Sequence, residues 1–210
     1  MPGPLPGVNL KPYSRTMLTQ SSIKLPRQYD QIVKKSEELN FNMLSDLKTG
    51  SLLKTLSASK TSGLMLELGT GTGLSLAWIA EGADKTSRIV SIDNNDQYQS
   101  VARRFFEDDD RISFECLDAN SWLKNYDGEK FDLVFADAFP GKFENLNFAL
   151  DLVKVGGFYV IDDLFPQPNW PENHQVNVDR LLNDLYKSNE FVFTPFDWST
   201  GLVVFTKIKD

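Results

Sequence analysis

The sequence is poor in cysteine and histidine, and its acidic residues outnumber its basic ones. Cys116 is the only cysteine among the 210 residues, which excludes an intrachain disulfide, and the alternating stretch around it predicts a buried thiol. Lysine and arginine number 22 against 29 aspartates and glutamates, giving a net charge of −7. This balance argues against a protein that grips the phosphates of a nucleic acid, because such a protein needs a basic face.

Long apolar runs are also missing. No stretch approaches the roughly 20 apolar residues that cross a membrane, and the N-terminus, with prolines at positions 2, 4, 6 and 12, has no apolar signal core. We therefore expect a cytoplasmic protein with neither a membrane nor a nucleic acid as partner.

The chain divides into an N-terminal part without strands and an α/β part. Residues 1–26 are rich in proline, serine and glycine and predict an irregular arm, while apolar spacing predicts helices over about 27–39 and 43–58. These helices have no strand partner, so they should cover one face of the α/β part. We expect residues 1–61 to form an arm and a helical cap, and residues 62–210 to form the ligand-binding domain.

From Gly63 onward, strand-like and helical patterns alternate five times, which calls for a parallel sheet with helices on both faces. The predicted strands cover 64–68, 88–93, 111–117, 131–137, 157–162, 191–196 and 201–207. The predicted helices cover 74–82, 96–107, 119–125, 143–154 and 173–188. Only Asp197–Gly201 separates the last two strands, too short for a helical crossover, so these strands should pair as an antiparallel hairpin. The prediction is a Rossmann-like, doubly wound, seven-stranded α/β fold that is mostly parallel and carries N-terminal helices.

Three glycines at alternate positions come after the first strand, at Gly69, Gly71 and Gly73 within Glu67–Gly73. Without a Cβ, such a turn lets a ligand approach the backbone, and the helix behind it offers its N-terminus. Asp93 ends the second strand twenty residues after Gly73, a spacing at which an acid binds the two hydroxyls of a ribose. Together these features predict a cofactor that contains a nucleoside. The simpler interpretation is a tight turn and, at Asp93, a helix N-cap, although Asn95 or Asp96 fits the N-cap role better.

The residues around the glycines favour a cationic ligand over a dinucleotide. The third glycine comes one residue too early for the G-x-G-x-x-G pattern, and the carboxylate of Glu67 would repel a pyrophosphate. S-adenosylmethionine has an ammonium, a sulfonium and a carboxylate but no phosphate. The amides of Gly69–Gly73 and the N-terminus of the following helix would bind its carboxylate. Glu67 would help to hold its ammonium, directly or through water, and Asp93 would bind its ribose.

Acidic residues end each of the first five strands, and the ligand of a doubly wound sheet lies beyond these carboxyl ends. Asp118 or the Ala119 backbone would meet the adenine, although Asp118 equally well caps the next helix. The predicted cofactor-binding residues are Glu67, Gly69, Thr70, Gly71, Thr72, Gly73, Asp93, Asn94, Asp118, Ala119, Asp137 and Phe139.

Four segments, in this order, resemble class I S-adenosylmethionine-dependent methyltransferases: Glu67–Gly73, Ile92–Asp93, Phe131–Ala138 and Val155–Asp163. The resemblance is greatest to the small O-methyltransferases of the catechol and caffeoyl-CoA type and to their bacterial relatives, and it covers about residues 45–207. It implies transfer of a methyl group from S-adenosylmethionine to a small phenolic acceptor. Analogy with the family also implies a homodimer.

The resemblance further implies a divalent metal such as Mg²⁺, held in that family by an Asp after the fourth strand and an Asp-Asn pair after the fifth. These positions correspond here to Asp137, Asp162 and Asp163, so an aspartate replaces the asparagine. The segment Phe139–Lys142 also replaces a shorter one in which a basic residue comes earlier. Three carboxylates suit Mg²⁺; the alternative is that they position a substrate or cap a loop without metal.

Methyl transfer requires in-line placement of the acceptor and removal of its proton. A metal would lower the pKa of a phenol from about 10; without one, Asp137, Lys142 or His174 must act as base or orienter. The simpler interpretations are a solvated Lys142 and a surface His174 at a helix N-terminus. Three other functions stay open: a binding protein on a methyltransferase fold, methylation of a protein, and, against the glycine spacing, an NAD-linked oxidoreductase.

Overall fold

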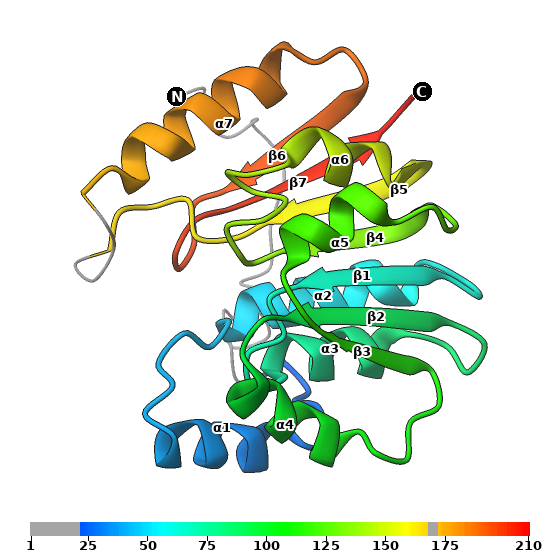
Figure 1. The fold of residues 1–210 in the computed structure, drawn as a ribbon, viewed down its shortest axis with the longest axis vertical. Coiled ribbons are helices and arrows are strands. Elements are labelled where there is room, and N and C mark those ends of the chain that lie inside the picture. Colours follow the sequence, from blue (N-terminus) through cyan, green and yellow to red (C-terminus); the bar gives the residue numbers. More distant parts are fainter. Residues whose placement is uncertain (1–21, 168–171) are drawn as a thin grey trace, which may run out of the picture.

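A computed structural model describes residues 22–167 and 172–210 of the chain. Its strands are β1 (Leu64–Leu68), β2 (Arg88–Asp93), β3 (Ile112–Cys116), β4 (Phe131–Ala136), β5 (Val153–Ile161), β6 (Phe191–Phe196) and β7 (Leu202–Lys207). Its helices are α1 (Tyr29–Glu38), α2 (Leu47–Ala58), α3 (Leu74–Gly82), α4 (Asp96–Phe105), α5 (Ala119–Asn125), α6 (Leu146–Asp151) and α7 (His174–Lys187). Figure 1 shows the strands side by side in one sheet with helices packed around it.

The sheet confirms the predicted topology. The strand order is β3-β2-β1-β4-β5-β7-β6. Strands β1 to β5 run parallel, and β7 is antiparallel to both β5 and β6, with which it forms the predicted hairpin. The chain moves outward from β1 to β3 and then returns to place β4 on the other side of β1, so the topological switch point lies between β1 and β4. Ligands of doubly wound sheets bind at such a point.

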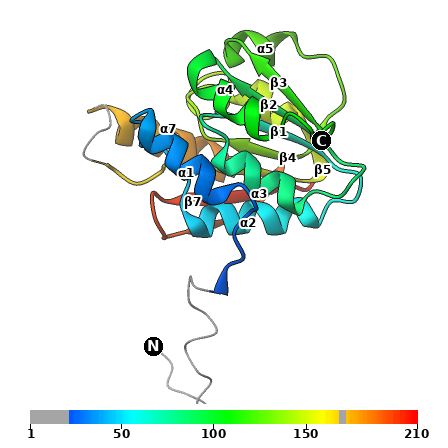
Figure 2. The same cartoon turned by 90° about the horizontal axis from the view of Figure 1, so that it is seen from below.

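Helices cover both faces of the sheet (Figures 1 and 2). Side chains alternate between the two faces along a strand, and all five residues of β1 are buried because neither face is open. The core beneath α1 to α4 contains Ile32, Leu53, Trp78 and Ala102 together with the strand residues Met65, Ile89 and Phe135. The core beneath α5 to α7 contains Leu123, Ala149 and Leu181 together with Leu66, Tyr159 and Phe205.

Two helices are shorter than their apolar spacing predicted. α2 begins at Leu47 because the Asp46 side chain caps it by accepting hydrogen bonds from two amides of its first turn. The helix predicted over 143–154 shrinks to α6, because β5 already begins at Val153 instead of residue 157. Val153 pairs with Phe131, and the register then shifts before the next pair, so the early part of β5 has no regular strand pattern.

The prediction of a buried Cys116 is wrong. The residue is exposed at the end of β3, because β3 is an edge strand that helices cover incompletely. Most of the predicted arm lies outside the described residues. The division of the chain at residues 61 and 62 stays a prediction, although α1 and α2 share one core with α3 and α4. Within the described ranges, no helix has the length and apolar character needed to cross a membrane.

Candidate active site

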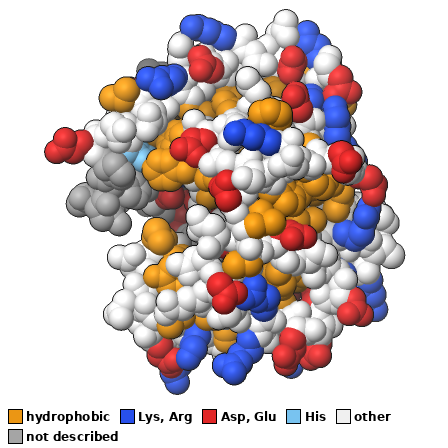
Figure 3. All heavy atoms as spheres, viewed as in Figure 1, with side chains coloured by type: hydrophobic (Ala, Val, Ile, Leu, Met, Phe, Trp, Pro, Cys, Tyr) orange, Lys and Arg blue, Asp and Glu red, His pale blue; other side chains and the backbone are white. Residues whose placement is uncertain are grey.

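A cavity of about 440 Å³ lies at the carboxyl ends of the strands around the switch point. Loops after β1, β2, β4 and β5 line it, and the loop before α2 contributes a further wall; these segments comprise residues 69–72, 92–95, 137–138, 162–163 and 41–46. The surface in Figure 3 is hollowed on the left, where the carboxyl ends of β1 to β5 lie in Figure 1. The position agrees with the ligand site expected for this topology.

The glycine loop after β1 turns sharply because three of its residues adopt a backbone conformation that favours glycine. The angle φ is +103° at Gly69, +52° at Gly71 and +94° at Gly73. A Cβ atom on Gly69 would lie 2.8 Å from the Asp137 carbonyl oxygen, and one on Gly71 would lie 2.7 Å from the Phe41 ring. Both distances are too short for a side chain. The glycines therefore bring the ends of β1 and β4 together at the cavity.

Most amides of the glycine loop already have partners inside the protein. The first two amides of Gly69–Gly73 donate to the Ile92 carbonyl at 2.9 and 3.1 Å, and the last one donates to a carbonyl within the loop. The central amide, that of Gly71, donates to Asp93 Oδ2 at 2.7 Å. Within this described loop, the Thr72 amide alone keeps no protein partner. Of the loop amides expected to bind a ligand carboxylate, only that of Thr72 is available, together with the N-terminus of α3.

Backbone amides hold the Asp93 carboxylate at the cavity wall. Besides the bond from Gly71, its Oδ1 accepts from the Asn95 amide at 2.8 Å. Each carboxylate oxygen offers a second lone pair, so both can also accept from the hydroxyls of a ligand. Asn95, not Asp93, caps α4 by accepting from the Tyr98 amide at 3.2 Å. The N-cap interpretation of Asp93 is therefore wrong.

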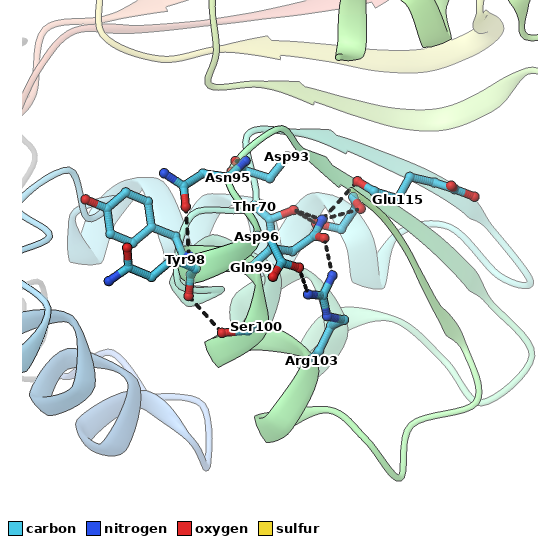
Figure 4. A network of polar contacts seen from close by, with 11 residues as sticks. Thr70, Asp93, Asn95, Asp96, Tyr98, Gln99, Ser100, Arg103 and Glu115 are labelled. Carbon is cyan, nitrogen blue, oxygen red and sulfur yellow. Dashed lines mark hydrogen bonds and ion pairs between the residues drawn. The ribbon is translucent and has the colours of Figure 1, made fainter. Parts of the chain in front are cut away.

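A buried hydrogen-bond network behind the cavity joins the glycine loop to β2, β3 and α4 (Figure 4). Gln99 donates from Nε2 to Thr70 Oγ1 at 3.2 Å and to the carbonyls of Ser91 and Glu115 at 3.3 and 3.0 Å. Arg103 donates to Gln99 Oε1 at 2.8 Å. The Thr70 hydroxyl also forms a hydrogen bond with the Ser91 hydroxyl at 2.7 Å. The Thr70 side chain therefore links the glycine loop to β2.

Glu67 lies beneath the glycine loop and is fully buried. Its carboxyl accepts hydrogen bonds from the hydroxyls of Ser75 at 2.6 Å and Ser91 at 2.5 Å, which ties β1 to β2 and α3. Burial raises the pKa of Glu67 to about 7; the two serine hydrogen bonds oppose this rise, and the charge of Asp93 adds to it. Because Glu67 does not line the cavity, the contact predicted between it and a ligand ammonium is not supported.

The raised pKa of Glu67 predicts a specific dependence of stability on pH. Folded Glu67 keeps its proton up to about pH 7, whereas the unfolded residue loses it near 4.5, so the free energy of unfolding should fall as pH rises between these values. The expected loss is on the order of 3 kcal/mol. Urea unfolding of the wild type and Glu67→Gln at several pH values would measure it. The difference between the two proteins should change with pH; a constant difference would contradict the prediction.

The structure separates the predicted cofactor-binding residues into two groups. Those that line the cavity are Gly69, Thr70, Gly71, Thr72, Asp93, Asn94, Ala119 and Asp137; those outside its lining are Glu67, Gly73, Asp118 and Phe139. Asp118 caps α5 by accepting from the amides of Asn120 and Ser121, each at 3.1 Å. Of the two roles that the sequence allowed for Asp118, the structure shows the helix N-cap, while the neighbouring Ala119 lines the cavity. The Phe139 side chain is half exposed.

Three acidic residues meet where β4 and β5 end. The Asp137 amide donates to the Leu68 carbonyl at 3.0 Å, which holds Asp137 beside the glycine loop, and Asp137, Asp162 and Asp163 all line the cavity. Burial raises the pKa of Asp137 well above its usual value, and the charges of Asp163 and Asp162 add to the effect. Burial also raises the pKa of Asp162 to about 6. The cavity wall thus holds carboxyl groups that bind protons more strongly than in water.

Lys142 and His174 lie behind these acids and do not line the cavity. The Lys142 side chain is only 4% exposed, and its Nζ donates to the Asp162 carbonyl at 2.9 Å and lies 3.8 Å from Asp163 Oδ2. His174 is also buried; because a carbonyl only accepts, its Nε2 carries the hydrogen that bonds the Asp163 carbonyl at 3.0 Å. Burial lowers the pKa of His174. The interpretations of a solvated lysine and a surface histidine are therefore wrong.

The donor set at these acids does not fit a divalent cation. Asp162 Oδ1 accepts from the Thr200 hydroxyl and the Asp163 amide, both at 2.8 Å, so this oxygen is engaged within the protein. The Lys142 ammonium already takes the Asp162 carbonyl and approaches Asp163. Among the described residues, no three side chains of the metal-binding types are arranged to hold an ion.

Sequence reasoning missed several residues that line the cavity, notably Phe41, Tyr98 and Thr200. The rings of Phe41 and Tyr98 pack with centroids 4.7 Å apart, and they come from the loop before α2 and from α4. Neither ring has a motif around it that would reveal this position. The one available signal was the pair Ser45 and Asp46, which are N-cap residue types that fall inside the helix predicted over 43–58.

Comparison with known proteins agrees with this geometry. The model of the O-methyltransferase family matches residues 20–189. The chain is 31% identical to a catechol O-methyltransferase of Mycobacterium tuberculosis over 121 residues, 55% of this chain and 54% of that protein. It is 27% identical to a probable caffeoyl-CoA O-methyltransferase of Dictyostelium discoideum over 172 residues, 75% of this chain and 73% of that one. The region of similarity spans about half the length of the Mycobacterium tuberculosis protein and of several other curated O-methyltransferases that the chain matches.

Solved structures share the fold. The O-methyltransferase TomG of Streptomyces achromogenes, crystallised with S-adenosylmethionine, superposes with a TM-score of 0.78 at 20% identity, covering 92% of this chain and 95% of that one. The family model covers most of the chain, including the glycine loop and all the acids at the strand ends. The chain belongs to the O-methyltransferase family.

Proposed function

We propose that this chain is an S-adenosylmethionine-dependent methyltransferase that methylates a hydroxyl of a small phenolic acceptor. The observation that carries the proposal is the Asp93 carboxylate, fixed by the Gly71 amide at the wall of a cavity that also contains Asp137 and Asp163. One cavity thus combines a partner for ribose hydroxyls with carboxyl groups that can take a proton. Catechol and caffeoyl-CoA methyltransferases among the relatives support the phenolic acceptor.

Most chemical groups of S-adenosylmethionine can be assigned a binding partner among the residues that line the cavity. Asp93 would accept hydrogen bonds from both ribose hydroxyls. The Thr72 amide and the N-terminus of α3 would bind the carboxylate. Ala119 and Tyr98 would border the adenine, and Asp137 would face the sulfonium, whose charge S-adenosylhomocysteine lacks. No phosphate has to be accommodated, which agrees with the negative charge of this wall.

The chemistry assigned to this chain is orientation and proton removal. When bound, S-adenosylmethionine supplies a methyl group on a sulfonium that is already a good leaving group. Asp137 would orient the acceptor hydroxyl and take its proton as the oxygen lone pair forms the new bond to the methyl carbon. The carbon–sulfur bond breaks with its electrons on sulfur, so a protonated Asp137, a methyl ether and S-adenosylhomocysteine result. General bases of this kind contribute about 10²- to 10⁴-fold to a rate.

Lys142 and His174 act through other residues in this proposal. His174 fixes the backbone of Asp163, which has a φ of +64°, and Lys142 fixes Asp162.

Analogy with the family also supports a homodimer, and the composition supports a cytoplasmic protein. Both stay part of the proposal.

Calorimetry with S-adenosylhomocysteine and a transfer assay with labelled S-adenosylmethionine test this function. Ligand at about one hundred times its Kd should raise Tm by about 5 °C or more. Catechol should accept the label, whereas 1,2-dimethoxybenzene, which has the same ring without a free hydroxyl, should not. Absence of binding would overturn the proposal. Binding without transfer to phenols would favour a binding protein or a methyltransferase that acts on proteins.

A further inference from the structure

Lys142 is a buried cation beside a cavity whose charged lining residues are all acids. Its side chain is 4% exposed, and its Nζ is 2.9 Å from the Asp162 carbonyl and 3.8 Å from Asp163 Oδ2. It also lies 5.6 Å from the centre of the Phe143 ring, on which a cation is attracted. A lysine is rarely this buried unless it is paired. Its neighbours therefore form a built site for a positive charge.

The loop between β4 and α6 is shaped to place this ammonium. Gly141 has a φ of +79°, and a Cβ there would lie 2.5 Å from Leu68 Cδ1, so the turn requires glycine. The buried Tyr159 hydroxyl donates to the Gly141 carbonyl, and the Lys142 amide donates to Phe139 at 3.2 Å. The conformation of the loop thus places the Lys142 ammonium beside Asp162 and Asp163, on the side away from the cavity.

A divalent cation bound by these acids would have to share them with the ammonium. The Lys142 ammonium already donates a hydrogen bond to the Asp162 carbonyl and lies near the Asp163 carboxylate. The positive charges of a metal ion and of this ammonium would repel each other strongly at a separation of a few ångströms. From the position of its Nζ we propose that Lys142 is a permanent internal counter-cation for Asp137, Asp162 and Asp163 and that it replaces the divalent metal. This inference rests on the proposed function, since it assigns the positive charge of that same site.

The consequence is a division of roles across the acids. Lys142 stands behind them as a positioning residue and stabilises their charge, while Asp137 and Asp163 line the cavity in which the ligands would bind. A metal-holding site would instead place its cation between the acids and the acceptor. The acceptor oxygen therefore meets a carboxyl group directly, which is the arrangement that the proposed general base requires.

Mn²⁺ binding to the full chain saturated with S-adenosylhomocysteine, monitored by electron paramagnetic resonance, tests the inference without an activity assay. The wild type should take up no stoichiometric Mn²⁺ below about 1 mM, and neither EDTA nor Mg²⁺ should shift its Tm. Lys142→Met should create a site that binds Mn²⁺ at least tenfold more tightly. The matched control Lys124→Met removes a lysine on α5 that is exposed, and it should bind as the wild type does.

One Mn²⁺ per wild-type chain with a Kd near 10 µM, weakened by Asp163→Asn, would overturn the inference. So would a Lys142→Met protein that is folded and still binds no Mn²⁺, because Lys142 would then not be what excludes the metal. If Lys142→Met does not fold, Lys142→Arg keeps the charge and must stay free of Mn²⁺, and the wild-type titration decides on its own. A chain that neither binds S-adenosylhomocysteine nor transfers methyl groups fails the proposed function instead, which the calorimetry reports separately.

Discussion

Asp137→Asn is expected to lower kcat for catechol methylation by about 10²- to 10⁴-fold while leaving the Kd for S-adenosylhomocysteine within about threefold. Asparagine has nearly the same shape as aspartate but cannot take the proton of the acceptor. Asp137 lines the cavity, and its amide is fixed on Leu68 at the end of β1, so the variant should keep the local backbone. Transfer of labelled methyl groups at saturating S-adenosylmethionine measures kcat, and calorimetry measures the Kd.

Two further variants show whether this loss belongs to Asp137. Asp151→Asn changes an exposed aspartate at the end of α6 in the same way and should leave kcat unchanged. Asp163→Asn removes the neighbouring carboxyl and should reduce kcat less than Asp137→Asn does. If Asp163→Asn loses more activity than Asp137→Asn, the base is Asp163 and the assignment to Asp137 is wrong.

Asp93→Ala is expected to weaken binding of S-adenosylhomocysteine by about 100-fold or more. The carboxylate would lose two hydrogen bonds from the ribose hydroxyls, and hydrogen bonds to a charged group contribute about 1.5–3 kcal/mol each. The variant also frees the Gly71 amide, which Asp93 Oδ2 holds at 2.7 Å, so the glycine loop should lose part of its order. Calorimetry at low temperature, where the variant stays folded, measures the affinity.

Asp93→Asn separates the two contributions. Its amide oxygen can still accept from Gly71 but lacks the charge and the second acceptor, so we expect an intermediate loss of about tenfold. Glu107→Ala removes an exposed acid just after α4 and controls for the change in net charge. An Asp93→Ala protein that binds within about threefold of the wild type would show that the ribose lies elsewhere.

The glycine loop illustrates which features of a binding site a sequence motif can predict and which it cannot. Its spacing predicted a sharp turn and a nearby acid, and both are found at Gly69, Gly71 and Asp93. The motif did not reveal that most loop amides bond to the protein itself, or that Glu67 is sealed beneath the loop. The hydroxyls of Ser75 and Ser91 that seal it come from a helix and from another strand, and no rule of sequence spacing connects them.

By itself the sequence determined the fold, the family and the edge of the sheet at which the ligand site lies. Alternating apolar patterns and glycine positions express preferences of neighbouring residues, and these suffice to predict a mostly parallel sheet that ends in an antiparallel hairpin. Only the tertiary structure decided which acids face the cavity and which charge accompanies them. Lys142 meets Asp162 across 20 residues, and Thr200 meets Asp162 across 38. Such contacts exist only once both loops are packed at one edge, because burial, and with it the role of a charged side chain, is a property of the assembled core.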